Sequence, residues 1–296
     1  MIVTRAAVLG RCMGVRRAVD LALQAAAAET KAGGRGRRVF TLGPLIHNPQ
    51  TVALLESKGI HALNEDDIDD RVAGAVVVIR AHGVPPRMRE ALETAGAHIV
   101  DATCPRVLAS QRRARDFAAR GWTVVIAGDR DHGEVTGIAG FAPGAVIVGN
   151  AEEAARVEAE GPVALIAQTT IKEEEYRDIK EALVAKFPMI EVVDSICPAT
   201  AERLAALAEL AKRCDALIVV GGRNSANTTR LYATAVSLGL PAWLVEGPDE
   251  LPNGMWRFKR VGLTAGASTP DEAIDAVETA LLAAAGGGQK PQGETR

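Results

Sequence analysis

The sequence lacks the features that mark several classes of protein. Aromatic residues make up only 3% of its 296 residues, so few rings are present on which nucleic-acid bases could stack. Its formal net charge of −3 gives no electrostatic reason to bind nucleic acid or an anionic membrane surface. The longest aliphatic runs, such as residues 75–79, are far too short to span a bilayer.

Familiar local motifs are missing as well. The N-terminus has no basic head followed by an apolar stretch, so we expect no signal peptide and a cytoplasmic location. No GxxxxGK[ST] or GxGxxG motif occurs, which removes two common nucleotide-binding fingerprints. Four cysteines are present without a CxxC pair, so a zinc-finger type of site is disfavoured. In a reducing compartment these cysteines favour metal or redox roles over structural disulfides.

What the sequence does have is three cysteines at nearly equal spacing. Cys12, Cys104 and Cys197 are separated by 92 and 93 residues, and each follows an apolar, strand-like run and precedes a helical pattern. Such a period predicts three copies of one unit. Three thiols at equivalent helix starts, where the thiolate form is favoured, indicate an iron–sulfur cluster or metal with three protein ligands and one open position.

The other elements repeat with the same period. Helices are expected at about residues 14–31, 105–120 and 198–213, and short apolar strands follow them at residues 38–42, 123–127 and 216–220. Apolar strands that alternate with helices indicate buried parallel sheets, whose ligands bind at the carboxyl ends of the strands. The predicted fold is therefore an α/β trefoil of three pseudo-repeated units, each with a small, mainly parallel sheet, around a central iron–sulfur site.

The predicted domain boundaries follow from this repeat. Residues 1–13 and 270–296 form a first strand, the Cys12 loop and a closing segment. The three α/β units are residues 14–100, 101–193 and 194–269.

Polar side chains in the strand-end loops supply further candidates. His47, His82 and His132 lie in these loops, and histidine with serine and asparagine donors can hold a phosphate group without a Walker loop. Glu134 lies two residues after His132 in one of these loops and is the candidate acid, because a carboxyl group in a closed site can deliver protons.

Two further features have simpler interpretations. Cys214 has no counterpart in the other repeats, and we expect it to be a small buried hydrophobe. The arginine-rich stretch from Arg106 to Arg120 is expected to be a solvated helix face.

Eight motifs follow one another in an informative order. They lie at residues 12–18, 46–48, 81–84, 101–105, 132–135, 168–170, 224–227 and 264–268. The set resembles the 4-hydroxy-3-methylbut-2-enyl diphosphate reductase (LytB/IspH) family over essentially the whole chain. The resemblance implies a [4Fe-4S] cluster on Cys12, Cys104 and Cys197, with the allylic alcohol of the substrate on the fourth iron.

The resemblance also implies the reaction and the roles of single residues. The substrate, (E)-4-hydroxy-3-methylbut-2-enyl diphosphate, would be reduced to isopentenyl and dimethylallyl diphosphate, the last step of the non-mevalonate pathway, with electrons from ferredoxin or flavodoxin. Glu134 would deliver protons and Thr169 would bind the substrate hydroxyl. The family's diphosphate ligands map onto His47, His82, His132, Ser225, Asn227 and Ser268.

The chain departs from the family pattern at three positions. Arg11 replaces an aromatic residue before the first cysteine, and Ala226 replaces a second serine that would donate to phosphate. Gly133 replaces a proline before the acid, which we expect to loosen the loop that carries Glu134. None of the three removes a cluster ligand or the acid, so they bear on substrate affinity more than on activity.

Two alternatives remain open at this point. Another trefoil iron–sulfur dehydratase, resembling quinolinate synthase, would share the cysteines but would not need the diphosphate donors. A non-catalytic iron–sulfur sensor would have no reason to retain Glu134 and Thr169 beside those donors.

Overall fold

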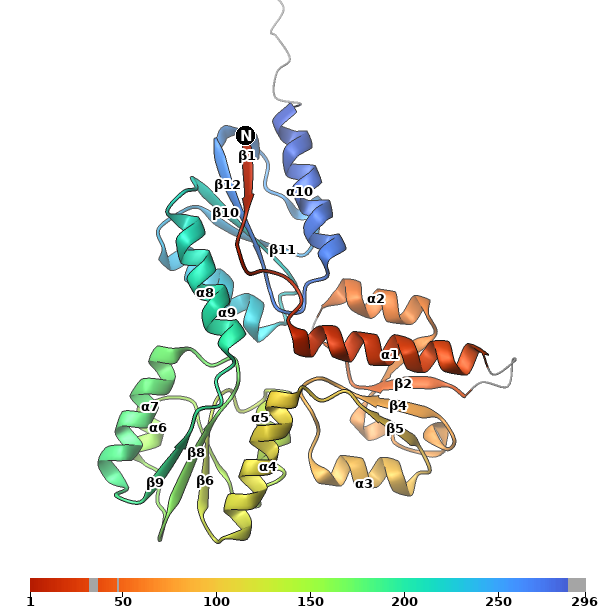
Figure 1. Cartoon of the computed structure of the whole chain (residues 1–296), viewed down its shortest axis with the longest axis vertical. Coiled ribbons are helices and arrows are strands. Elements are labelled where there is room, and N and C mark those ends of the chain that lie inside the picture. Colours follow the sequence, from red (N-terminus) through yellow and green to blue (C-terminus); the bar gives the residue numbers. More distant parts are fainter. Residues whose placement is uncertain (32–36, 47, 287–296) are drawn as a thin grey trace, which may run out of the picture. The chain divides into compact units, whose positions relative to one another are not determined.

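A computed structural model describes residues 1–31, 37–46 and 48–286 (Figure 1). The chain divides into two compact units. Unit 1 contains residues 1–12, 47–51 and 199–296, and unit 2 contains residues 13–46 and 52–198. Sheet A belongs to unit 1, and sheets B and C belong to unit 2.

All three sheets have four parallel strands in an equivalent order. Sheet B has the order β3 (Ile60–Leu63), β2 (Val39–Leu42), β4 (Val76–Ile79), β5 (His98–Asp101); sheet C has β7 (Val146–Val148), β6 (Thr123–Ala127), β8 (Val163–Ala167), β9 (Ile190–Val193). Sheet A has β11 (Ala242–Val245), β10 (Ala216–Val220), β12 (Arg260–Ala265), β1 (Ile2–Arg5). The predicted α/β fold with three repeated units is thereby confirmed, and the predicted segment boundaries stay a proposal.

Helices cover both faces of each sheet. Along β8, Val163, Leu165 and Ala167 pack toward α6 (Ala151–Ala155) and α7 (Glu173–Lys186), whereas Ala164 and Ile166 pack toward α4 (Pro105–Ala119) and α5 (Gly133–Ala139). All five residues of β8 are buried. Burial on both faces explains why the central strands have unbroken apolar sequences.

Sheets A and B follow the same plan. In sheet B, α1 (Met13–Lys31) and α2 (Pro49–Ser57) pack on one face and α3 (Pro86–Thr94) on the other, with 3-10 turns at Glu65–Asp67 and Asp70–Val72. In sheet A, α8 (Pro198–Ala211) and α9 (Ala226–Ser237) share one face, and α10 (Asp271–Gly286) covers the other, with 3-10 turns at Pro248–Glu250 and Met255–Arg257.

The helices expected after the three cysteines are confirmed as α1, α4 and α8, with ends within about two residues of the prediction. The expected strands are confirmed as β2, β6 and β10. Among the described residues, no helix combines the length and apolar character that a bilayer crossing requires.

Candidate active site

The three repeats hold their cysteines with the same backbone hydrogen bond. The N–H of Cys104 donates to the carbonyl of Ala81 at 2.9 Å, that of Cys197 to Thr169 at 2.9 Å, and that of Cys12 to Ala267 at 3.0 Å. Each acceptor lies two residues beyond a central strand, β4, β8 or β12, and each cysteine follows the neighbouring edge strand. The period in the sequence therefore corresponds to a repeated local geometry.

The cysteines differ in burial according to their place in the repeat. Cys12, Cys104 and Cys197 are half-buried, and each directly precedes a helix. Cys214 has no equivalent and is buried beneath α8 and α9, and this burial raises the pKa of its thiol. A half-buried thiol at a helix start is suited to act as a thiolate ligand, and a buried one with a raised pKa is not.

Two candidate histidines meet in unit 2. The rings of His82, in the turn after β4, and His132, before α5, lie edge to face with centroids 5.1 Å apart and an interplanar angle of 76°. His132 caps α5, because its Nδ1 accepts the N–H of Glu134 at 3.2 Å. With Nδ1 used as an acceptor, a neutral imidazole carries its hydrogen on Nε2 and can donate it to a ligand.

Glu134 is buried and bound by both of its carboxylate oxygens to one residue. Oε1 accepts the backbone N–H of Thr169 at 2.6 Å, and Oε2 accepts the hydroxyl of Thr169 at 2.8 Å. The expectation that Glu134 lies in a loop is wrong, because it occupies the first turn of α5. A carboxyl group held this way has a fixed orientation and lies beside a hydroxyl through which a proton can be passed.

These contacts form a continuous path within unit 2. It runs from Cys104 through the Ala81 carbonyl to His82, then through His132, Glu134 and Thr169 to Cys197. Sequence-predicted residues that lie up to 115 positions apart, from His82 to Cys197, are thus brought together in one unit.

Unit 1 holds the remaining candidates around the ends of β10 and β12. Asn227 Oδ1 accepts the N–H of Ala267 at 2.9 Å, next to Ser268. Ser225 caps α9 by accepting the N–H of Thr228, and the hydroxyls of Ser225 and Ser268 are 3.5 Å apart. In Asn227 the acceptor oxygen is occupied, which leaves the two N–H groups of its amide as donors.

Two predicted features are not placed by the structure. His47 lies outside the described residues, so its predicted role is untested. Within residues 1–31, 37–46 and 48–286, no three or more Cys, His, Asp or Glu side chains are grouped so as to hold one metal ion. Cys12 lies in unit 1 and the other two candidate ligands lie in unit 2, so the three-cysteine ligand set stays a prediction.

The three departures from the family pattern have different surroundings. Arg11 is half-buried, with Nη2 3.4 Å from Thr51 Oγ1, and Ala226 is the first residue of α9. Gly133 is the first residue of α5, and a Cβ there would lie 3.3 Å from Nη2 of Arg80. Gly133 is thus part of a helix and packs against a guanidinium group, and the expected loosening of the segment that carries Glu134 stays a prediction.

Sequence reasoning missed several residues that support the site. Arg80 forms an ion pair with Glu65, at 2.7 Å, and packs over Gly133. Ser195 binds both backbone groups of Ala167, accepting its N–H at 2.8 Å and donating to its carbonyl at 3.0 Å. In the sequence, Arg80 is marked only by its place directly before the His82 turn. Ser195 is marked only by its proximity to Cys197.

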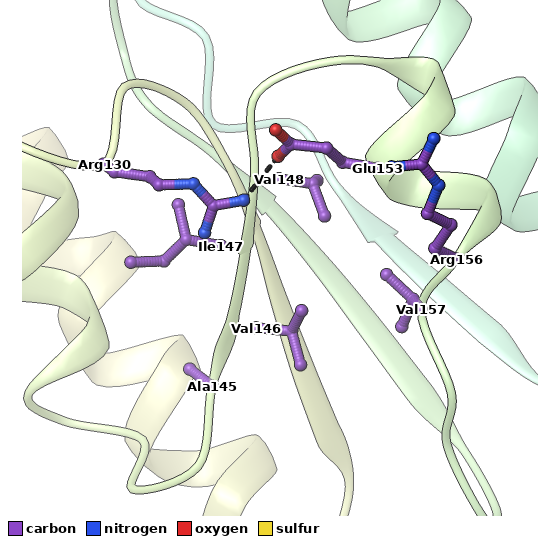
Figure 2. A pocket seen from close by; sticks show the side chains of 8 residues that line it. All are labelled: Arg130, Ala145, Val146, Ile147, Val148, Glu153, Arg156 and Val157. Carbon is purple, nitrogen blue, oxygen red and sulfur yellow. Dashed lines mark hydrogen bonds and ion pairs between the residues drawn. The ribbon is translucent and has the colours of Figure 1, made fainter.

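A hollow of about 520 Å³ lies along the exposed edge of sheet C (Figure 2). It is bordered by β7 and by the ion pair between Arg130 and Glu153, at 2.6 Å. None of the predicted site residues lines this hollow. Its ion pair ties the segment just before His132 to α6, so it anchors the loop that presents the histidine.

The fold and these loops define a class of α/β proteins with three parallel-sheet repeats and one equivalently placed cysteine in each repeat. The family model described as LytB protein matches residues 3–282. A relative from Treponema denticola, named 4-hydroxy-3-methylbut-2-enyl diphosphate reductase, is 48% identical over 293 residues, which cover 95% of this chain and 99% of the relative. The chain therefore belongs to the LytB protein family.

Solved structures agree with this assignment. The E-1-hydroxy-2-methyl-but-2-enyl-4-diphosphate reductase of Plasmodium falciparum is similar with a TM-score of 0.85 and 27% identity, over 94% of this chain and 87% of that one. A second structure, described as (E)-4-hydroxy-3-methyl-but-2-enyl diphosphate reductase, the terminal enzyme of the non-mevalonate pathway, has a TM-score of 0.72 and 34% identity, over 96% and 100% of the two chains. The resemblance inferred from the motifs is confirmed.

Proposed function

We propose that this chain reduces (E)-4-hydroxy-3-methylbut-2-enyl diphosphate to isopentenyl and dimethylallyl diphosphate, as the last step of the non-mevalonate pathway. The reaction consumes two electrons and two protons and releases the allylic hydroxyl as water. The observation that carries the proposal is the buried Glu134 carboxylate bound at both oxygens by Thr169, beside two candidate anion-binding histidines. Relatives of high coverage bear the name of this activity.

We assign the cluster ligands to Cys12, Cys104 and Cys197. Support comes from their equivalent hydrogen bonds, their place before helices and their half-buried thiols, which fit a soft, thiolate-bound iron centre. A [4Fe-4S] cluster on these ligands would supply electrons and one iron without a cysteine for the substrate hydroxyl. The free cysteines are consistent with a cytoplasmic location, and ferredoxin or flavodoxin is the proposed electron donor.

Glu134 and Thr169 are proposed to move the proton that accompanies loss of the hydroxyl. The Thr169 hydroxyl donates to Glu134 in the structure; when the carboxyl group is protonated, it can donate to Thr169, whose own hydrogen then points to the substrate oxygen. The hydroxyl leaves as water, and the electron pair on the allyl fragment takes a second proton at either end. Protonation at the two ends gives the two products.

The diphosphate is proposed to bind to neutral and imidazole donors: His47, His82, His132, Ser225, Asn227 and Ser268. The acceptor atoms of His132 and Asn227 are engaged by backbone N–H groups, which directs their N–H hydrogens toward a ligand. An anion is favoured by such donors because hydrogen bonds to a charged oxygen are stronger than neutral ones.

The decisive assay is anaerobic turnover of the substrate by reconstituted protein with reduced viologen dye. We expect both products, and about four iron and four sulfide per chain. Cys104→Ser should abolish cluster loading, whereas Cys214→Ser serves as the matched control and should load normally. Full loading of Cys104→Ser would contradict the ligand assignment. A fully loaded wild-type protein that leaves the substrate unchanged would contradict the activity.

The alternatives left by the sequence are not favoured by any of these relatives. A quinolinate-synthase-like dehydratase would not need the donors that are assigned to the diphosphate. A non-catalytic iron–sulfur sensor would not need the Glu134–Thr169 pair. In the same assay, turnover of the allylic diphosphate would exclude both.

A further inference from the structure

Helix α4 carries three arginines whose side chains have no acidic partner among the described residues. It begins directly after Cys104 and contains four arginines and one aspartate, a net charge of 4 − 1 = +3 in a chain whose net charge is −3. Arg106, Arg112 and Arg113 are exposed, and their guanidinium groups form no hydrogen bond or ion pair with any described residue. Arg115 pairs with Asp116. We call Arg106, Arg112 and Arg113 the α4 arginines.

Arginines elsewhere commonly have acidic partners. Ion pairs of 2.6–2.9 Å occur at the following positions: Arg5 with Asp275, Arg71 with Asp69, Arg80 with Glu65, Arg89 with Asp101, Arg130 with Glu153, Arg223 with Glu250 and Arg260 with Asp215. On α4, three arginines within eight residues lack such a partner. Exposed like charges in one stretch create a positive potential that attracts acidic molecules.

The start of α1 extends this basic surface. Nη1 of Arg17 donates to the carbonyl of Thr103 at 3.1 Å, which brings the first turns of α1 beside the Cys104 loop in unit 2. On the outer side of α1 lies a hollow of about 550 Å³ lined by Met13, Arg16, Arg17, Asp20, Leu21 and Gln24. Met13 is 65% exposed and follows Cys12 in the chain.

The α4 arginines lie on the exposed part of the helix. Gln111 and Val107 lie on the buried face of α4, and a Cβ on Gly83, next to His82, would collide with the Gln111 amide. Arg106 and Arg113 are seven residues apart, two helical turns, and share an outer face. These arginines are thus exposed on the helix that follows a candidate cluster ligand, whereas Gln111 on its buried face lies beside the His82 turn.

We infer that the α4 arginines and the first turn of α1 form the docking surface for a small acidic electron-carrier protein. The inference rests on the proposed function, which needs two electrons from outside the chain. Electron transfer requires the carrier to approach a cluster ligand closely, and Arg106 lies two residues beyond Cys104. A basic surface at that place orients an acidic carrier and raises its association rate.

Charge reversal on α4 tests this surface. The variant is Arg106→Glu/Arg113→Glu, which changes the charge by −4. The matched control is Arg177→Glu/Lys180→Glu on α7, which makes the same change on the opposite face of sheet C. Each reconstituted holoenzyme is assayed with two reductants: a purified acidic [2Fe-2S] ferredoxin and a viologen dye, which needs no docking surface.

The α4 variant should raise the KM for ferredoxin about tenfold at low ionic strength, since steering charges change association rates by roughly 10–10³-fold. Its ferredoxin rate should also lose most of the salt dependence of the wild type. Turnover with viologen, the KM for substrate and the iron content should stay unchanged, and the control should match the wild type with both reductants.

Direct binding separates this inference from the proposed function. Ferredoxin binding to wild-type and variant holoenzyme is measured by calorimetry at low salt, without substrate. If the wild-type protein fails to turn over the substrate but binds ferredoxin more tightly than the α4 variant does, the proposed activity is overturned and the docking surface is retained. The docking surface would be overturned if the wild type, the α4 variant and the control had the same affinity and the same KM for ferredoxin. It would also be overturned if the α4 variant lost activity equally with ferredoxin and with viologen. Binding of a nucleic acid in place of ferredoxin would also overturn it.

Discussion

At the scale of single residues, the most constrained group in the candidate site is the Glu134 carboxylate. It is 2% exposed, and both of its oxygens are used by Thr169. Such a group is positioned more sharply than a surface carboxylate, because any rotation would leave the Thr169 N–H without an acceptor.

Replacing this acid by its amide should separate binding from proton transfer. Glu134→Gln can still accept the Thr169 N–H through its carbonyl and donate to the Thr169 hydroxyl through its amide. It cannot release a proton, so turnover with viologen should fall by about 10²–10⁴-fold. Substrate binding, followed by Mössbauer or EPR spectroscopy of the loaded protein, should be retained. Near-normal turnover would place the proton source elsewhere, and lost binding would make Glu134 a positioning group.

The positions of the candidate residues near strand ends were predictable from the sequence, and the contacts that they make were not. The positions of Cys104, His82 and Glu134 at strand ends are set by local pattern, because parallel strands end at one edge. Partners such as Arg80 for Gly133, 53 residues away, depend on how two sheets pack within unit 2. No local periodicity records such a contact.

At the scale of elements, hydrogen bonds inside the strand-end turns hold the candidate ligands in place. Ser195 lies two residues before Cys197 and bonds both backbone groups of Ala167, at the end of β8. Ser195→Ala leaves these buried groups without partners and should lower the free energy of unfolding by about 1–3 kcal/mol. Urea unfolding of cluster-free protein measures this.

An exposed serine provides the comparison for that measurement. Ser237 donates only to the carbonyl of Thr234 at the end of α9, so Ser237→Ala should change stability by no more than about 0.5 kcal/mol. Similar small effects at both positions would show that the Ser195 bonds do not hold the turn.

The turn before Cys104 should respond to acid. Burial acts to raise the pKa of Asp101, but hydrogen bonds from Thr103 and Arg89 outweigh burial and hold the pKa below its ordinary value. The stability from Asp101 is therefore fully present above its unfolded pKa of about 3.9, and it is lost as the pH falls through the lower folded value.

Urea unfolding of cluster-free protein between pH 6 and 2 tests whether the stability contributed by Asp101 is lost as the pH falls. The free energy of unfolding of the wild type should decline below about pH 4, and Asp101→Asn should reduce that slope. Asp178→Asn, at an exposed position on α7, is the control. An unchanged slope in Asp101→Asn would mean that Asp101 titrates alike in the folded and unfolded chain.

Elements differed in how well the sequence predicted them. The long helices α1, α4 and α8 and the fully buried strands had strong periodicity. The edge strands β3, β7 and β11 have only three or four residues and are partly exposed, and α5 has seven residues, so none carries a clear pattern. Glu134 was placed in a loop for this reason.

At the scale of the whole molecule, the repeat was the most predictable property. A spacing of 92 and 93 residues between three cysteines corresponds to one strand order used three times. The cysteine spacing could not predict that β1 completes the third sheet, because β1 lies at the other end of the chain from β10, β11 and β12. Strand β1 forms one edge of sheet A, where it pairs in parallel with β12 and Ile2 lies opposite Arg260.

That pairing has a consequence for the order in which the protein is made. Sheets B and C are each encoded within one continuous stretch, so each can assemble during synthesis as soon as its last strand has left the ribosome. Strand β1 emerges before both of these sheets, yet it must wait for β12, which is made some 258 residues later. Until then the backbone edge that pairs with β12 has no strand beside it, and it is open to holdase chaperones or to mispairing.

Refolding from denaturant should preserve this order, since contacts between distant residues form slowly. In pulse-labelling hydrogen exchange, the backbone amides of residues 2–5 should become protected after those of β6 and β8. Simultaneous protection would show that β1 pairs early despite its separation from β12.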